Sequence, residues 1–320
     1  MSRVNMGVDV SKDFLDVAVR VGQQTPRRFA NDPGGIDQLV AWVREINPVR
    51  VIFESTGAYQ KKAVMALLAE GLPAVVVNAR QVRDFAKATG KLAKTDAIDA
   101  AVLAHFGEVV DTVVRPLPTP EIQEFQQIYD RRSQLVRILA AEKNHRHVGG
   151  TPQVMANINH HISYLKEQIH GLEESMNLFV ESTEAFRAKD DVLQSIPGIG
   201  PQVSRTLLAH LPELGHGSRQ TISALVGVAP YNKDSGKESH LRHIQGGRKK
   251  VRIGLYQAAI VAIRCCPVMK VFYISLKARG KPSKVALIAV ARKLLVLANA
   301  LIRTMKPFED RTTSVCPNTA

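Results

Sequence analysis

The chain has 320 residues, 45% of them hydrophobic, which is enough for two folded domains and a connecting segment. Its formal net charge of +14 comes mainly from one region, because residues 231–306 contain 17 Lys and Arg but only two acidic residues. Such a basic block favours a nucleic acid as partner, and the alternative is a generally solvated basic surface.

Cysteine usage and hydropathy exclude several further classes of protein. Cys265, Cys266 and Cys316 form no CxxC pair, which argues against a disulfide framework and a thiolate zinc site and favours a reducing, cytoplasmic environment. The first ten residues carry charges and lack the apolar stretch typical of a signal peptide. The longest apolar stretch, 284–302, is interrupted by two basic residues, so we expect a buried or amphipathic helix and no membrane span.

Residues 1–110 alternate between strand and helix patterns. Short segments rich in β-branched and apolar residues predict strands. Segments bounded by a capping residue, such as Asp32 as an N-cap, or by glycine predict helices. The expected strands are 3–10, 14–21, 26–31, 49–56 and 73–78, and the expected helices are 32–46, 58–71, 79–88 and 95–110. Three strands followed by helix, strand, helix, strand and helix is the order of a ribonuclease-H-like, or RuvC-like, α/β domain.

The middle of the chain is predicted to be a helical connector. Residues 111–120 contain three prolines, which is typical of a linker. In 121–185, seven apolar residues recur at alternating intervals of four and three, a heptad seam typical of a coiled coil. They are Ile158, Ile162, Leu165, Ile169, Leu172, Met176 and Phe179. The segment 121–147 is the expected partner helix, and the seam fits either an intramolecular core or a contact in a dimer.

Two predicted helices flank the sequence IPGIG at 196–200. This pattern is typical of a helix-hairpin-helix, in which glycines such as Gly198 and Gly200 expose backbone N–H groups that bind a phosphate. A tight structural turn is the alternative. We therefore expect a RuvC-like domain at 1–115, a coiled-coil connector at 116–190, a mainly helical basic domain at 191–308 and a tail at 309–320.

Four acidic residues are candidates for a metal site. Asp9 and Glu54 stand at the ends of the first and fourth predicted strands, which are neighbours in a ribonuclease-H-like sheet. Asp96 and Asp99 are three residues apart on one face of a predicted helix. Converging carboxylates repel one another unless a cation lies between them, and oxygen ligands favour Mg²⁺, with Mn²⁺ as a substitute. Such an ion stabilises the attacking and leaving oxygens of a phosphoryl transfer.

These residues also have ordinary interpretations. The sequence TDAID can simply begin a helix, with Thr95 as the N-cap and Asp96 and Asp99 favoured by the helix dipole. Ser235, in the sequence KDSGK, is either a turn residue or a nucleophile that requires activation. Ser239 is a rival nucleophile that lacks the preceding acid and the following glycine.

Seven motifs resemble one family. They are GVDVSKDFLDVAV, FESTGAY, KTDAIDAAVLA, IPGIGPQVSRTLLAHLPELG, LVGVAPYNKDSGK, GGRKKVRIGLYQAA and KVALIAVARKLL, and they span nearly the whole chain. The chain resembles the DEDD transposases of bacterial insertion sequences that are guided by a bridge RNA, a group that includes the pilin-gene invertases. The resemblance implies a RuvC-like nuclease domain, a coiled coil and a domain with a catalytic serine, in a protein of the bacterial cytoplasm associated with the nucleoid.

Roles for particular residues follow from this resemblance. Asp9, Glu54, Asp96 and Asp99 would bind Mg²⁺, and Ser235 would attack DNA to give a phosphoserine intermediate. The site would be shared between subunits of a homo-oligomer, a dimer assembling to a tetramer, on donor and target DNA with a bridge RNA. The basic block and the IPGIG turn, apart from the resemblance, give the residues expected to contact nucleic acid: Lys233, Lys237, Arg242, Arg248, Lys249, Lys250, Arg252, Gly198 and Gly200.

Three other functions fit parts of the pattern. A Holliday-junction-type nuclease would use the same carboxylates with water as the nucleophile. A sugar kinase or ATPase of the actin-like class also begins with a Gly-x-Asp strand, but it requires a second phosphate loop that the basic C-terminal half does not offer. A non-catalytic DNA-binding protein explains the charge and leaves the four carboxylates unexplained.

Overall fold

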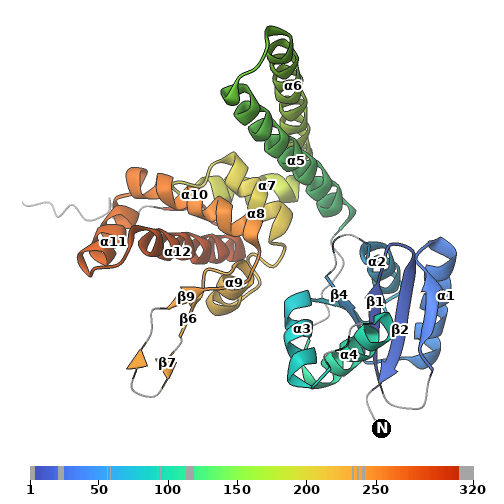
Figure 1. The fold of residues 1–320 in the computed structure, drawn as a ribbon. Coiled ribbons are helices and arrows are strands. Elements are labelled where there is room, and N and C mark those ends of the chain that lie inside the picture. Colours follow the sequence, from blue (N-terminus) through green and yellow to red (C-terminus); the bar gives the residue numbers. More distant parts are fainter. Residues whose placement is uncertain are drawn as a thin grey trace, which may run out of the picture. The chain divides into compact units, whose positions relative to one another are not determined.

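The computed structural model describes residues 4–20, 25–55, 57, 59–91, 93, 95–112, 119–232, 234–235, 238–239 and 242–309. The chain forms two compact units, Met1–Leu117 and Pro118–Ala320, and Figure 1 shows the elements of both. The helices predicted as a separate connector belong to the same unit as the basic region.

The first unit is built on a five-stranded sheet. Its strands, in spatial order, are β3 (Arg27–Ala30), β2 (Phe14–Arg20), β1 (Asn5–Val10), β4 (Arg50–Glu54) and β5 (Ala74–Val77). β1, β2 and β3 are antiparallel neighbours, whereas β4 runs parallel to β1 and β5 runs parallel to β4. This order matches the one predicted for a ribonuclease-H-like domain.

Helices cover both faces of this sheet (Figure 1). They are α1 (Pro33–Ile46), α2 (Lys61–Ala69), α3 (Ala79–Ala88) and α4 (Asp96–Val109). Met6 and Val8 of β1 are buried with α1 and α2 on one face, and Ile52 of β4 is buried with α3 and α4 on the other. Because side chains alternate along a strand, Gly7 and Asp9 face α4.

Capping residues determine where α1 and α4 begin. The Asp32 side chain accepts a hydrogen bond of 2.8 Å from the Gly35 N–H, as predicted for an N-cap. Thr95 caps α4 in the same way, accepting from the Ile98 N–H at 3.3 Å. This cap places two acidic residues in the first turn of α4.

The second unit is mainly helical. Its elements are α5 (Pro120–Val148), α6 (Pro152–Ser182), α7 (Glu184–Gln194), α8 (Pro201–His210), α9 (Arg219–Val226), β6 (Pro230–Tyr231), β7 (Asp234–Ser235), β8 (Glu238–Ser239), β9 (His243–Ile244), α10 (Lys249–Cys265), α11 (Pro267–Ala278) and α12 (Ser283–Thr304). Its largest core lies among α7 to α12, and Leu193, Leu255 and Leu294 are fully buried there.

α5 and α6 form a hairpin of two long helices (Figure 1). The predicted heptad seam faces α5 in this hairpin, because Leu165 and Ile169 are buried with Leu135, and Met176 is buried with Phe125. The seam therefore has an intramolecular partner, which was one of the two interpretations left open by the sequence.

The apolar stretch predicted to be a buried or amphipathic helix is α12. By length and composition α12 could cross a membrane, and α10 and α11 pass the same test only as one span bent by 102°. Its side chains instead fill the core of the second unit, where Val290, Ala291, Leu294 and Leu295 are fully buried. α12 is therefore a core helix of this unit.

Candidate active site

Asp9 and Glu54 occupy adjacent positions on two parallel strands. The β1–β4 register pairs Val8 with Phe53, so the next residue of each strand, Asp9 and Glu54, comes at the carboxyl end of the sheet. Both residues are half-buried. The fold brings two of the four predicted ligands to one edge, the edge at which α/β proteins commonly bind ligands.

Gly7 sets the distance between the sheet and α4. A Cβ at Gly7 would overlap the carbonyl oxygen of Ala100 and the backbone nitrogen of Ala104, and would lie 2.7 Å from the Cβ of Leu103. Only a residue without a side chain permits this approach of strand to helix. Because Ala100 directly follows Asp99, the contact brings the first turn of α4 to the end of β1.

Asp9 is the electrostatic centre of the four carboxylates. Burial raises the pKa of Asp9, the charges of Asp99, Asp96 and Glu54 raise it further, and the Val10 N–H opposes them, so that the pKa is about 6 and not the usual 3.8. The carboxylates that the sequence predicted to converge thus act on one another in the folded chain.

The ligand chemistry of the four carboxylates suits a hard divalent cation. Across the described residues, no three His, Cys, Asp or Glu side chains are arranged to hold a metal ion, so the carboxylates are neighbours that do not close into a cage. The pKa of Asp9 is raised first by burial and then by repulsion from the neighbouring carboxylates, and Mg²⁺ or Mn²⁺ would relieve that repulsion. The residues therefore fit such an ion by charge and by donor type.

Two residues that were not predicted from the sequence pattern lie beside this set. Asp16 of β2 is paired directly with Asp9, and Arg28 of β3 is paired with Asp16. The Arg28 guanidinium donates to Asp16 at 2.9 and 3.2 Å and to Asp96 at 3.3 Å. The sequence does contain a signal for Asp16. Residues 9 and 16 are equidistant from the turn at 11–14 that joins β1 to β2, so they pair across the hairpin.

Ser235 belongs to a narrow hairpin in the second unit. β6 pairs with β9 near α9, and β7 pairs with β8 further along the hairpin (Figure 1). The backbone of Ser235 stands opposite Glu238. The side chain of Ser235, and both Lys233 and Lys237, lie outside the described residues.

Two of the arginines predicted to contact nucleic acid have partners within the protein. Arg248 donates two hydrogen bonds to Glu213, at 2.5 and 2.6 Å, and one to the His210 carbonyl at 2.9 Å. Arg252 donates to the carbonyl of Gly246. These contacts tie the start of α10 to the segment after α8 and to the GGRKK loop.

Lys250 is also engaged within the chain, through Asp130 of α5. Burial raises the pKa of Asp130, but hydrogen bonds from His210 and Lys250 outweigh it and lower the pKa to about 2. This cluster joins α5, α8 and α10 at one point. Lys249 and Arg242, by contrast, are exposed at the surface.

The two glycines of the IPGIG turn have different surroundings. Gly198 has φ of +94°, and a Cβ there would lie 2.7 Å from the Ala258 carbonyl oxygen and 2.8 Å from the Ala262 Cβ. Gly200 precedes α8 as its N-cap and has open space at its Cβ position. An open groove of about 450 Å³ runs between this turn and α10, lined by Gln194, Ile196, Pro197, Gly198, Ile199, Gly200, Val203, Gln257, Ala258, Ile260 and Val261.

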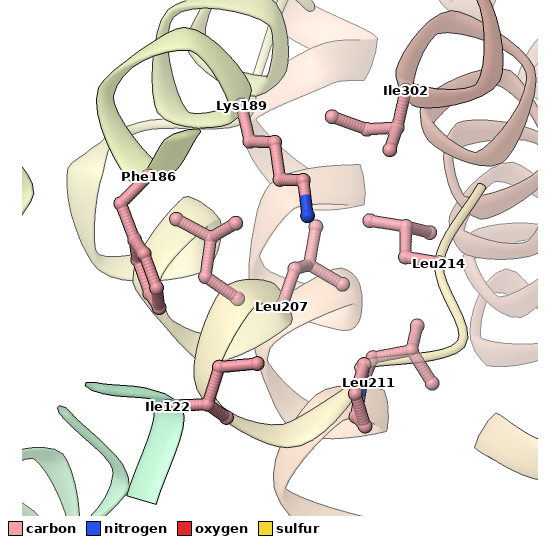
Figure 2. A pocket seen from close by; sticks show the side chains of 9 residues that line it. Ile122, Phe186, Lys189, Leu207, Leu211, Leu214 and Ile302 are labelled. Atoms are coloured by element: carbon pink, nitrogen blue, oxygen red, sulfur yellow. The ribbon is translucent and has the colours of Figure 1, made fainter. Parts of the chain in front are cut away.

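A second, smaller cavity of about 50 Å³ lies among α5, α7, α8 and α12. Figure 2 shows the Lys189 side chain extending among Leu207, Leu214 and Ile302. This volume is that of one or two water molecules. It is a feature of core packing and is too small for a substrate.

The sheet order, with acidic residues at the ends of β1 and β4 and in the first turn of α4, is consistent with the ribonuclease-H-like domain of a DEDD transposase. A family model described as Transposase, of the DEDD type of IS110, matches residues 6–148. A second model, described as Transposase IS116/IS110/IS902 family, matches residues 190–274. Together the two models cover more than two thirds of the chain. The chain belongs to the IS110 family of DEDD transposases and recombinases.

Similar proteins extend the comparison to nearly the whole chain. The Pilin gene-inverting proteins of Moraxella lacunata and Moraxella bovis are each 27% identical over 325 residues, which covers 97% of this chain and 99% of the relative. The Insertion element IS110 uncharacterized 43.6 kDa protein of Streptomyces coelicolor is 26% identical over 157 residues, covering 47% of this chain and 36% of the relative. The chain is thus a transposase or recombinase of an insertion sequence, and its substrate is DNA.

Proposed function

We propose that this transposase cuts and rejoins DNA through a metal-bound carboxylate tetrad and a serine nucleophile. Asp9, Glu54, Asp96 and Asp99 form the tetrad, and Ser235 is the nucleophile. The observation that carries the tetrad is the placement of Asp9 and Glu54 at adjacent strand ends, with the first turn of α4 held against β1 at Gly7. The pKa of Asp9, raised by burial and then by the charges of the other three carboxylates, supports it. A group that is costly to ionise without a cation gains from binding one.

The Ser235 oxygen bonds to the scissile phosphorus while the bond from phosphorus to one deoxyribose oxygen breaks. The serine proton passes to solvent and the leaving oxygen takes up a proton. A deoxyribose hydroxyl of the new strand then attacks the phosphoserine and releases Ser235, so rejoining needs no ATP. The tetrad would hold Mg²⁺, and the ion would supply charge stabilisation at the phosphate.

We also propose how the two halves of the site are used. Asp9 and Ser235 belong to different units of one chain, and we propose that they meet between subunits of a homo-oligomer that joins donor and target DNA. The α5–α6 hairpin would serve as the coiled-coil connector, and the IPGIG turn would bind phosphate as a helix-hairpin-helix. The basic region from residue 231 supports a nucleic-acid partner, and we propose a bridge RNA as the guide.

A covalent adduct on Ser235 is the direct test of the nucleophile. The full chain is expressed with its native flanking DNA, denatured and digested with nuclease, and its peptides are searched by mass spectrometry for an attached nucleotide. We expect an adduct on Ser235 in the wild type and in Ser239→Ala, and none in Ser235→Ala or Asp9→Asn. Recombination at wild-type levels in Ser235→Ala would overturn the serine mechanism and favour water as the nucleophile.

The guide is tested by the RNA that purifies with the protein. We expect one defined RNA species, encoded by the flanking DNA, to resist nuclease in the complex and to be required for recombination in a reconstituted reaction. Recombination of the native DNA by RNA-free protein would contradict this part of the proposal.

A further inference from the structure

One row of charged residues crosses the sheet at the level of Asp9. Arg28, Asp16 and Asp9 are paired in sequence across β3, β2 and β1, and Glu54 is the neighbour on β4. Directly paired residues of antiparallel strands point to the same face. The row therefore faces α4, and it contains a third carboxylate and one fixed positive charge in addition to the two strand residues of the tetrad.

Arg28 is held in place on several sides. Its guanidinium binds both oxygens of Asp16, at 2.9 and 3.2 Å, and reaches the Asp96 carboxylate at 3.3 Å. It also lies 5.1 Å from the centroid of the Phe14 ring. The Asp16 side chain is only 13% exposed, so its charge would be poorly solvated without this partner. Arg28 thus compensates one carboxylate outside the tetrad and contacts one within it.

We propose that Arg28 is the resident cation of the carboxylate site, a positioning residue that neutralises Asp16 and holds Asp96 until a divalent ion takes that carboxylate over. The inference rests on the proposed metal-binding function of the tetrad and adds a competitor to it. Arg28 occupies one oxygen of Asp96, at 3.3 Å, so a divalent ion that uses Asp96 has to share this carboxylate with the guanidinium or displace it. Arg28 therefore weakens ion binding and permits the acidic cluster to fold without the ion.

The adjacent arginine provides a matched control. Arg27 precedes Arg28 on β3 and points to the opposite face, because its guanidinium lies over the Trp42 ring at 4.7 Å. Arg27→Gln and Arg28→Gln remove the same charge from neighbouring positions of one strand. A general change in net charge would act on both variants alike, whereas competition for Asp96 concerns Arg28 alone.

Direct binding of Mn²⁺ to the full chain without DNA tests the inference. The dissociation constant is measured by electron paramagnetic resonance of free Mn²⁺ at low salt, in the wild type, Arg28→Gln, Arg28→Lys and Arg27→Gln. We expect Arg28→Gln to bind about fivefold more tightly, since one unit charge close to a divalent ion is worth roughly three- to tenfold in affinity at a solvated site. Arg28→Lys keeps the charge and is expected to lie between Arg28→Gln and the wild type.

A double variant guards against a folding defect in Arg28→Gln. Asp16→Asn together with Arg28→Gln leaves no uncompensated charge at Asp16, and its Mn²⁺ affinity is expected between those of the wild type and Arg28→Gln. If the wild type binds Mn²⁺ and Asp9→Asn does not, the metal site stands. If Arg28→Gln and Arg27→Gln then bind Mn²⁺ with equal affinity, the role of Arg28 is overturned. Wild-type binding that Asp9→Asn leaves unchanged would overturn the metal site and this inference with it.

Discussion

Gly7 of β1 and Ala100 of α4 lie in backbone contact, because a Cβ on Gly7 would overlap the Ala100 carbonyl oxygen. This contact joins the strand that ends in Asp9 to the helix that begins with Asp96 and Asp99. The packing of the first unit and the spacing of its carboxylates are therefore set by the same pair of residues.

Substituting Gly7 with alanine is expected to disturb both the packing of the first unit and the spacing of its carboxylates. Gly7→Ala should lower the free energy of unfolding by about 2–4 kcal/mol, because the helix must move away from the sheet. The matched control is Gly34→Ala in α1, where an added Cβ has its nearest neighbour, Asp32 Oδ1, at 3.7 Å. Urea unfolding checks the comparison, and equal stability of the two variants would show that the contact is not tight.

The raised pKa of Asp9 predicts a specific pH dependence of the metal-free protein. In the folded chain Asp9 holds its proton up to about pH 6, whereas in the unfolded chain it releases it near 3.8. The folded state therefore binds more protons in this window, and the Asp9 contribution to stability falls as the pH rises from about 4 to above 6.

Asp9→Asn should remove this contribution. We expect the variant to melt at a higher temperature than the wild type at pH 7.5 without metal, and close to it at pH 4.5. Addition of Mn²⁺ should raise the melting temperature of the wild type only. Thermal scans with a chelator and with Mn²⁺ provide the measurement. A lower melting temperature for Asp9→Asn than for the wild type, at pH 7.5 without metal, would contradict the prediction.

Arg248 and Lys249 are adjacent but should differ in function. Arg248 binds both oxygens of Glu213, and both side chains are less than a third exposed. Arg248→Gln should therefore lower the free energy of unfolding by about 1.5–3 kcal/mol. Lys249→Gln should leave stability unchanged and reduce by about one the slope of log affinity for DNA against log salt. Denaturant unfolding and salt-dependent binding, measured on both variants, separate the two roles.

Alanine substitutions at the two glycines of the IPGIG turn should have different effects on stability and DNA binding. Gly198→Ala forces a side chain into the backbone of α10 at a positive φ, and we expect a loss of about 2–4 kcal/mol in unfolding free energy. Gly200→Ala has room for its Cβ and should change stability by less than about 1 kcal/mol. If Gly200→Ala weakens DNA binding while remaining folded, the turn contacts phosphate. Unfolding and binding titrations of both variants decide the matter.

Short-range signals accounted for much of the first unit. The Asp32 and Thr95 caps follow from local sequence and hold in the structure. The adjacency of Asp9 and Glu54 followed from the strand order, which is a property of the whole domain. What the sequence could not supply is the approach of α4 to Gly7, because a glycine in a strand indicates a close neighbour without saying which element it is.

Long-range pairings were the main omission. The basic run predicts a nucleic-acid contact for Arg248 but not its bond to Glu213, which is 35 residues away with no local pattern to connect the two. The heptad seam presents a similar case. Its period predicts which side of α6 is buried, whereas the partner depends on which apolar helix the chain brings to it, and here Phe125 and Leu135 of α5 fill that place.

The base of the α5–α6 hairpin is bonded to the helices beyond it. The Tyr129 hydroxyl lies 2.6 Å from the Thr206 hydroxyl, and Gln126 donates to the Ala209 carbonyl at 2.5 Å, so α5 is fixed to α8 at this point. From Tyr129 to its end at Val148 the helix extends about 28 Å further, at about 1.5 Å per residue. A small rotation at the base of the hairpin therefore becomes a larger movement at its tip. A tilt of about five degrees at the base displaces the tip by roughly 2.5 Å, and a displacement of the tip acts on α8 through the bonds at Tyr129 and Gln126.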